Sequence, residues 1–374
     1  MGSEERVSMG RAVGIKEVAE RAGVSITTVS HALNDKGRIS PDTRRRVYEV
    51  AEELGYRPNA TARNLAGGRS GVIGLCVAQL GEISFTVSDY SYFVELISAA
   101  SVAALDRGYA LMLAPSARPD AWNPSQVDGA IVVDPIAGDP MLEGVERTGA
   151  PVVTTGRVPG RSSGWWVDTD HRSVTRALLD HLAARGAERI ALLGSLRIAS
   201  YSIDTHEAYL EWCDEHGQQP IDVTVRGDLT ESAGFEATVK LLRRKRPPDA
   251  VHCPLEPLAL GALHAAQSLG LSVPHDLMVT GCPDSAAGKS SRPGLTACEF
   301  YPNRIGEAAV EILTALIEGI DPPQAQVYVP SRLIARGSTR RRVVNPPPTR
   351  KQAGSGGSAP ARRRTATPRR RSAR

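Results

Sequence analysis

Residues 15–67 constrain the fold most strongly, because two short helical patterns there are joined by one tight turn. Apolar side chains at helical spacing predict a first helix over Ile15–Ala22, and Gly23 permits the left-handed turn that ends it. Ser25 is placed to cap a second helix, Ile26–Asn34. Two short helices joined in this way form a helix-turn-helix, whose second helix enters the major groove of DNA.

The second helix has two chemically different faces. One face is apolar and predicts a core contact; it consists of Val29, Ala32 and Leu33, together with Val24. The opposite face carries side chains that suit base edges, thymine methyl groups or phosphates, namely Ile26, Thr27, Ser30 and His31. The alternative is an ordinary three-helix domain with a polar face.

Two further helical patterns follow. Ser40 is placed to cap a third helix that has Pro41 at its first position and runs to about Leu54. A short pattern over Ala60–Ala66 follows and ends at Gly67. Because this last segment is too short to be stable alone, it would need DNA or a partner to form.

Two long stretches of this region, VAERAGVSITTVSHALN and TRRRVYEVAEELGYRPNATARNLAGGRSGVIGL, closely resemble the LacI/GalR family of bacterial transcription regulators. The resemblance implies that Ile26, Thr27 and His31 read bases. It implies phosphate contacts by Ser25, Thr28, Ser30, Asn34 and Ser40. It also implies a hinge helix that places Asn59, Ala62 and Leu65 in the minor groove.

In that hinge, Leu65 would act as an apolar wedge between base steps and kink the duplex. The alternative is that Leu65 packs on its own domain. By the same resemblance, the protein binds a palindromic double-stranded operator as a homodimer, and pairing of dimers into a tetramer is left open.

Charge distribution and cysteine content limit the classes of protein to which this chain can belong. The net charge of +4 conceals an uneven distribution: residues 339–374 hold 12 Lys or Arg and no acidic residue, whereas residues 70–338 carry −11. The five cysteines lack metal-ligand spacing and are expected to be buried, reduced thiols. No signal peptide or membrane-length apolar run is evident, so we expect a cytoplasmic, nucleoid-associated protein.

From residue 71 the pattern changes to alternating strands and helices, beginning with the strand Val72–Val77 and closing with the strand Leu277–Gly281. This alternation predicts parallel sheets with helices on both faces, in two lobes. The stretch PPDAVHCPLEPLALGALHAAQSLGLSVPHDLMVTGC also resembles the LacI/GalR family, whose ligand domain shares its fold with periplasmic sugar-binding proteins. The predicted fold is therefore an all-α helix-turn-helix headpiece plus an α/β two-lobed, periplasmic-binding-protein-like effector domain.

We expect a disordered N-terminus over residues 1–13, the headpiece over 14–58 and the hinge and linker over 59–70. The two-lobed effector-binding and dimerisation domain would cover 71–337, followed by a disordered basic tail over 338–374. The tail would add sequence-independent phosphate contacts; alternatively, it serves only solubility.

The expected effector pocket departs from the family pattern. The family's ligand-clamping Arg is absent from the stretch 205–209, and Pro283 replaces a family Asp. Because a sugar site needs many paired polar groups, the pocket would bind a less polar or aromatic small molecule, or none. The candidate lining residues are Tyr90, Phe93, Trp165, Asp170, Tyr201, Thr205, Glu256 and Asp284, and the alternative for each is a surface or packing role.

The sequence contains no HExxH, GxSxG, P-loop or GxGxxG motif, so we expect no catalytic residues, no metal site and no cofactor. Three hypotheses remain. The protein is a ligand-responsive DNA-binding regulator, usually a repressor; a DNA-binding regulator with a degenerate pocket, controlled by its level or by a partner; or a binding protein for small molecules. The headpiece and hinge argue against the third.

Overall fold

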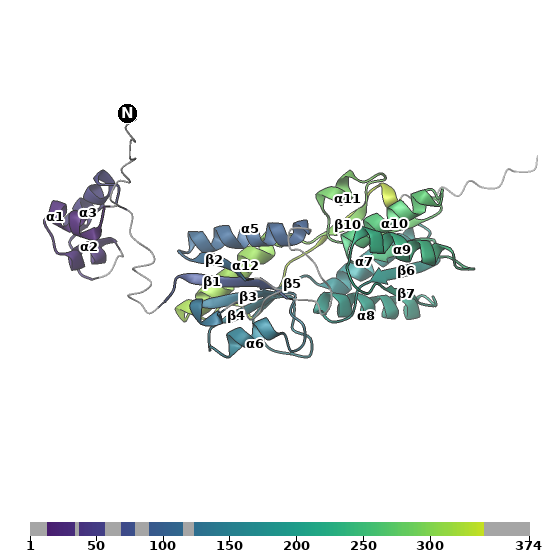
Figure 1. Ribbon diagram of the computed structural model, residues 1–374, viewed down its shortest axis with the longest axis horizontal. Helices are drawn as coiled ribbons and strands as arrows, with labels where there is room; N and C mark the ends of the chain where they lie inside the picture. Colours follow the sequence, from purple (N-terminus) through teal and green to yellow (C-terminus); the bar gives the residue numbers. More distant parts are fainter. Residues whose placement is uncertain (1–12, 34–36, 57–68, 79–89, 115–122, 340–374) are drawn as a thin grey trace, which may run out of the picture. The chain divides into compact units, whose positions relative to one another are not determined.

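A computed structural model of the protein describes residues 13–33, 37–56, 69–78, 90–114 and 123–339 (Figure 1). In its described residues the headpiece has three helices, α1 (Ile15–Ala22), α2 (Ile26–Leu33) and α3 (Pro41–Glu53). Gly23 adopts the predicted left-handed conformation, with φ of 65°. The side-chain oxygens of Ser25 and Ser40 accept hydrogen bonds from the amides of Thr28 and Thr43, at 3.0 and 3.2 Å. These caps and turns explain why the predicted helix bounds agree with the structure.

The headpiece has its own apolar core. Val18 of α1, Val29 and Ala32 of α2, and Val47 of α3 are each no more than 1% exposed, and Ala51 packs with them. Burial of this shared apolar surface stabilises three helices that would each be too short to persist alone.

The N-terminal lobe is built on a six-stranded parallel sheet with the order β11-β5-β4-β3-β1-β2. Its strands are β1 (Val72–Val77), β2 (Ala110–Ala114), β3 (Gly129–Val133), β4 (Val152–Thr155), β5 (Trp166–Asp168) and β11 (Gln326–Tyr328). Figure 1 shows α5 (Ser91–Asp106) and α12 (Pro302–Glu318) over one face of this sheet and α6 (Pro140–Glu146) over the other. Each face has a separate apolar cluster.

The C-terminal lobe repeats this plan with the order β12-β10-β9-β8-β6-β7, in which only the edge strand β12 runs antiparallel. Its strands are β6 (Ile190–Gly194), β7 (Ile221–Thr224), β8 (Ala250–Cys253), β9 (Met278–Gly281), β10 (Thr296–Glu299) and β12 (Arg332–Ile334). Its helices are α7 (His171–Ala184), α8 (Ser200–Glu215), α9 (Glu231–Leu242), α10 (Glu256–Ser268) and the short α11 (Ala286–Ser290).

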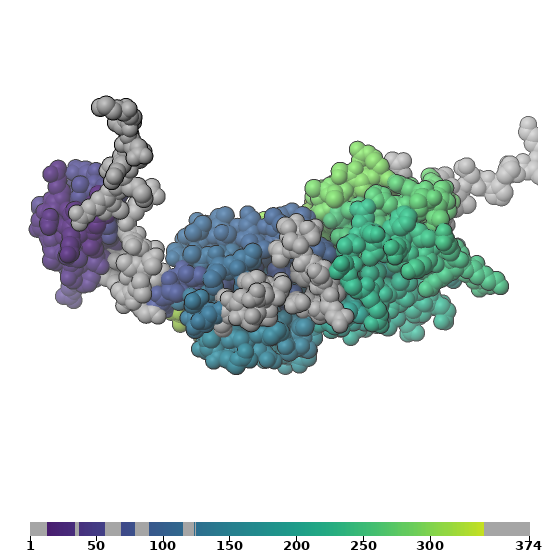
Figure 2. Space-filling view, in the orientation of Figure 1, coloured from purple at the N-terminus to yellow at the C-terminus, as the bar shows by residue number. Residues whose placement is uncertain are grey.

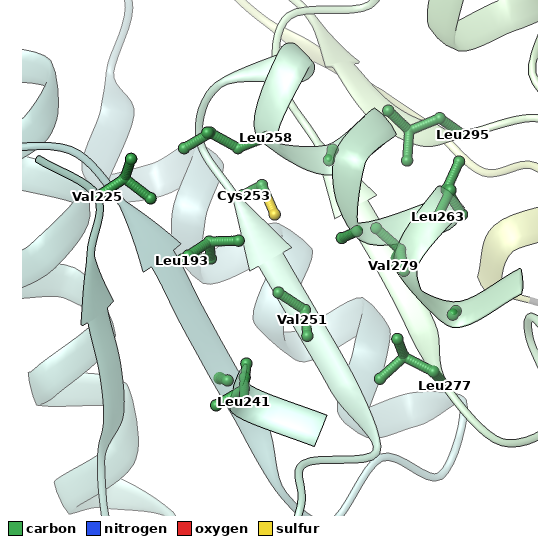
Figure 3. Packing of buried hydrophobic residues seen from close by; sticks show 14 of the residues in the cluster. Leu193, Val225, Leu241, Val251, Cys253, Leu258, Leu263, Leu277, Val279 and Leu295 are labelled. Carbon is green, nitrogen blue, oxygen red and sulfur yellow. The ribbon is translucent and has the colours of Figure 1, made fainter. Parts of the chain in front are cut away.

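The core of this lobe lies between the sheet and the pair α9 and α10. Figure 3 shows Leu193, Val251 and Val279 projecting from the strands toward Leu258 and Leu263 of α10. A second cluster on the opposite face packs α7 and α8 against the same sheet. Figure 2 shows the surface of this lobe, coloured from teal to green.

Within the described residues, the chain passes between the lobes three times, after β5 into α7, after β10 into α12, and after β11 into β12. The two sheets confirm the predicted two-lobed α/β domain. The prediction that the series closes at Leu277–Gly281 is wrong, because β10, α12, β11 and β12 follow. The sequence pattern predicts a helix over His206–His216; the structure begins this helix, α8, six residues earlier, at Ser200.

The folded body continues to Thr339, two residues beyond the predicted end at 337. The hydroxyl of Ser338 donates to the carbonyl of Val279 at 2.6 Å and accepts from the amide of Thr296 at 2.8 Å. Thr339 pairs with the ring of His181 at 2.8 Å. All five cysteines are buried and unpaired, as predicted.

Candidate nucleic-acid interface and ligand cavity

One face of α2 is left uncovered by the headpiece core. Ile26 is 43% exposed at the start of the helix, and Thr27 and His31 are exposed on the same side. An added Cβ atom at Gly37 would lie 2.8 Å from Nδ1 of His31, so the imidazole lies close over this glycine. The three side chains predicted to read bases therefore share an accessible surface.

The side chains predicted to contact phosphates surround this face. The hydroxyls of Ser25 and Thr28 are hydrogen-bonded to each other at 2.8 Å, and Ser25 is exposed. Ser30 is half-buried, and Ser40 is exposed at the start of α3. Asn34 and the hinge residues Asn59, Ala62 and Leu65 lie outside the described residues. The headpiece thus presents polar hydroxyls beside an exposed apolar side chain.

A cavity lies between the two lobes, where residues that follow strand ends come together. It encloses about 690 Å³ of empty space, part of which is open to solvent. Its described lining is Tyr90, Tyr92, Phe93, Asp134, His171, Tyr201, Leu229, Pro254, Leu255, Pro283 and Phe300. Apart from Asp134 and the imidazole and phenol groups, this lining is apolar. Such a cavity at the carboxyl ends of parallel strands is where ligands bind in open α/β folds.

The ionisable groups of the cavity have perturbed pKa values. Burial raises the pKa of Asp134 to about 7, and the nearby Asp168 carboxylate adds to this rise. Burial lowers the pKa of His171, whose Nε2 lies 3.6 Å from Oδ1 of Asp168. The imidazole is therefore neutral near pH 7, and Asp134 is the group whose charge responds to conditions in this range.

Contacts across the cavity connect the lobes. The hydroxyl of Tyr90 donates to the carbonyl of Leu229 at 3.0 Å. Arg157, which follows β4, forms a hydrogen-bonded ion pair with Asp204 of α8. Its Nε lies 3.6 Å from Oδ2 of Asp168, at the end of β5. A ligand that changes the angle between the lobes would have to change the contacts of Tyr90 with Leu229 and of Arg157 with Asp204.

Three of the eight predicted pocket residues line the cavity, namely Tyr90, Phe93 and Tyr201. Trp165 precedes β5 and packs against the core of the N-terminal lobe, at the amino end of the strand rather than the carboxyl end. Thr205 is buried in α8 and lines a smaller neighbouring cavity.

The three predicted acidic residues are engaged in structural contacts instead of lining the cavity. Asp170 caps α7 by accepting from the amide and the hydroxyl of Ser173, at 3.0 and 2.6 Å. Glu256 accepts from the amide of Gly288 at 2.8 Å and from the hydroxyl of Ser285. The side chain of Asp284 is fully buried against Arg336 at 2.6 and 2.9 Å.

Tyr92, Asp134, His171 and Phe300 were not among the predicted pocket residues. Two of them could have been predicted from their positions at strand ends, because Asp134 directly follows β3 and Phe300 directly follows β10. Pro254 and Pro283 also line the cavity; Pro254 directly follows β8, and Pro283 lies two residues after the end of β9. Position at the carboxyl end of a parallel strand therefore predicts the cavity-lining residues better than the family's polar motif does.

Within the described ranges, no cluster of His, Cys, Asp or Glu has the arrangement of a metal site. None of the helices described there is both long and apolar enough to cross a membrane.

A helix-turn-helix headpiece joined to a two-lobed α/β body with a cavity between the lobes defines a class of DNA-binding, ligand-binding regulators. Comparisons with known proteins agree with this class. Residues 14–59 match the family model for bacterial regulatory proteins of the lacI family, and residues 179–339 match a periplasmic binding protein-like domain. The chain belongs to the LacI family of bacterial transcriptional regulators.

Its relatives are regulators rather than enzymes. The chain is 30% identical over 337 residues to the HTH-type transcriptional repressor PurR of Erwinia tasmaniensis, covering 87% of this chain and 96% of the relative. It is 29% identical to catabolite control protein A of Priestia megaterium, covering 88% and 99%. Among solved structures, the lac repressor dimer bound to operator and the anti-inducer ONPF aligns with a TM-score of 0.72 and 26% identity, covering 88% and 100%.

Proposed function

We propose that this protein is a sequence-specific regulator, acting as a repressor in the cytoplasm, that binds a palindromic operator as a dimer. A small molecule bound between the lobes would change its affinity for DNA. The observation that carries the proposal is the uncovered face of α2, where the apolar Ile26 lies exposed beside Thr27 and His31. An exposed isoleucine on a recognition helix suits a thymine methyl group, and the imidazole suits a guanine edge.

The remaining DNA contacts follow from this docking. Phosphates flanking each half-site would meet Ser25, Thr28, Ser30, Asn34 and Ser40. Asn59, Ala62 and Leu65 would lie in the minor groove, with one leucine from each protomer inserted at the operator centre.

A row of exposed apolar side chains on the N-terminal lobe supports dimerisation. Val94, Val102 and Leu105 of α5 are 48%, 58% and 63% exposed, and Leu113 of β2 is 51% exposed. Positions 94, 102 and 105 fall on one side of a helix, and β2 packs beside α5. Because a monomer rarely leaves several large apolar side chains together in water, we propose that a second copy covers this face.

A second candidate function is favoured by the engagement of Asp170, Glu256 and Asp284 in structural contacts. With these carboxylates unavailable, the cavity would be degenerate as a sugar site. DNA binding would then be set by protein level or by a protein partner. A stabilising shift of the unfolding temperature by a small molecule would separate the two, since specific binding must stabilise the native state.

The test is a genomic-fragment binding selection at moderate salt, with the full chain and with a chain ending at Arg341. Recovery of one palindromic motif by both proteins is the expected result. His31→Ala should relax the preference at one base pair of each half-site. Tyr48→Ala removes a side chain that is 45% exposed on α3 and should leave the motif unchanged. Failure of both proteins to select any motif would reject the proposal.

A further inference from the structure

The cavity between the lobes gathers a large share of the aromatic residues of this chain. The sequence holds only 17 Phe, Trp and Tyr residues, and five of them line the cavity: Tyr90, Tyr92, Phe93, Tyr201 and Phe300. The imidazole of His171 joins them, with its ring centroid 5.3 Å from that of Phe300. The ring pairs Tyr90–Phe93 and Tyr92–Phe93 meet edge to face, at 5.8 and 5.4 Å. The cavity wall is therefore rich in π systems, whose negative faces attract cations.

The described lining of the cavity carries charge of one sign. Among these residues Asp134 has the one carboxyl group, and neither Lys nor Arg is present. The Asp168 carboxylate is close enough to Asp134 to add to the rise in its pKa. His171 is neutral near pH 7, because burial lowers its pKa. A negatively charged ligand would meet repulsion here, and a positively charged one would meet attraction.

The backbone and the neighbouring residues fix the position of Asp134, and its carboxyl group is free to bind such a ligand. Its backbone adopts a left-handed conformation, with φ of 49°, and its amide donates to the carbonyl of Thr155 at 2.7 Å. Gly156 leaves room for the carboxyl group, since an added Cβ atom there would lie 3.2 Å from Oδ1 of Asp134. In the part of the chain that the structure describes, no hydrogen bond or ion pair engages this side chain. The carboxyl group is half-buried at the cavity wall, and a partly desolvated acceptor gains from a ligand that supplies a hydrogen-bond donor.

We propose that this cavity binds an organic cation, in which an aromatic or other apolar body carries a protonated amine that pairs with Asp134. The amine would lie against the carboxylate and the neighbouring ring faces, and the apolar body would fill the space bounded by Leu229, Leu255 and Phe300. This inference rests on the proposed function, because it names the class of effector for the same site.

Three probes with one body and different charges test the inference: 2-phenylethylammonium, 2-phenylethanol and 3-phenylpropanoate. Binding to the full-length protein would be measured by titration calorimetry and by the unfolding midpoint, at pH 8 and moderate salt. We expect the cation to bind at least about tenfold more tightly than the alcohol, and the anion to bind least.

Two cavity variants and one control assign this preference to the site. Asp134→Asn should reduce the affinity for the cation to the affinity for the alcohol. Asparagine tolerates the left-handed conformation at this position. Phe300→Leu keeps the cavity wall apolar but removes an aromatic ring. It should weaken binding of the cation more than binding of the alcohol. Asp214→Asn removes an exposed carboxylate from α8 and should change nothing.

The outcomes separate this inference from the proposed function, because operator binding is measured on the same samples. An alcohol or anion that binds as tightly as the cation would overturn the inference and leave an effector site in place. Absence of binding by all three probes at millimolar concentration would also overturn it. A cation preference without operator binding would keep the inference and reject the regulator.

Discussion

At the scale of single residues, two carboxyl groups near strand ends show that neighbouring charged side chains determine whether a carboxyl group stabilises the fold or can bind a ligand. Asp284 lies three residues after β9 and is neutralised by Arg336 and by Lys289, whose Nζ is 3.3 Å away. Asp134 follows β3 and faces the cavity without such a partner. The first therefore stabilises the fold, whereas the second remains available to a ligand.

The raised pKa of Asp134 predicts a specific pH dependence of stability. Because the folded-state pKa is about 7, the folded protein holds this proton more tightly than the unfolded chain does. The stabilisation is present at acidic pH and is lost as the pH rises toward 7. Asp134→Asn should therefore raise the free energy of unfolding at pH 8 by about 1–2 kcal/mol, less than the full shift implies because solvent reaches the cavity.

Chemical denaturation of both proteins at pH 5 and pH 8 measures this effect. The advantage of Asp134→Asn should shrink at pH 5, where the wild-type carboxyl is already protonated. The groups near Asp134 are Asp168, His171, Tyr92 and Tyr201; burial raises the pKa of Asp168 and lowers the pKa of His171. An advantage that is equal at both pH values would contradict the assignment to this carboxyl.

The buried ion pair of Asp284 predicts a large stability loss in Arg336→Ala. That substitution leaves a fully buried carboxylate with Lys289 as its remaining ionic partner, so we expect a cost of about 3 kcal/mol. Urea unfolding is the measurement. Arg176→Ala breaks the more exposed pair with Glu215 and should leave the unfolding midpoint nearly unchanged. Equal effects of the two substitutions would show that burial does not control the cost.

At the scale of elements, local signals explain which predictions agree with the structure. The headpiece helices were predicted within a residue or two because serine caps and Gly23 mark their ends. The strand Val72–Val77 was found because it is a continuous apolar run. The strands β11 and β12 have three residues each, and none of these residues is buried, so no continuous apolar run marks them; pairing with β5 and β10 creates them.

The cavity was less predictable than the fold, because its composition depends on which side chains already have partners. An acidic residue such as Glu256 is a candidate ligand-binding residue in a sequence. Its hydrogen bonds to Ser285 and Gly288 become visible only in three dimensions. The availability of Asp134 is likewise a tertiary property. Aromatic residues were a better guide, since Tyr90, Phe93 and Tyr201 do line the cavity.

The close packing of α9 against α10 predicts that a single methyl group will destabilise the C-terminal lobe. An alanine Cβ at Gly234 would lie 2.6 Å from both Cα and the carbonyl oxygen of Leu258, and neither atom can move without its helix. Helix propensity favours alanine over glycine by about 1 kcal/mol. Overpacking should exceed this gain, so we expect Gly234→Ala to cost about 1–2 kcal/mol net.

Thermal unfolding compares this variant with a roomier position. Gly194 ends β6, and an added Cβ atom there would be 3.8 Å from its nearest neighbour, so Gly194→Ala should be close to neutral. A stabilising effect of Gly234→Ala would mean that the two helices separate at little cost.

At the scale of the whole molecule, charge is divided along the chain in a manner that suits DNA binding. Residues 70–338, which include nearly all of the two-lobed body, carry a net charge of −11, whereas residues 11–69 carry +4. This distribution attracts DNA to the headpiece and repels it from the acidic lobes. The 12 basic residues of 339–374 add a second, larger positive charge to the same chain.

The basic segment after Thr339 predicts a change in the salt dependence of DNA binding. A chain ending at Arg341 keeps the bonded Ser338 and Thr339 but loses ten Lys or Arg residues. Each phosphate contact that disappears should make the slope of log affinity against log salt shallower by about 0.9. Non-specific binding should weaken while the selected motif stays the same, since the base-reading side chains are intact. A tail of equal length built from Gly and Ser separates charge from length: it should behave like the truncated chain, and a slope equal to that of the full chain would show that these residues make no phosphate contacts.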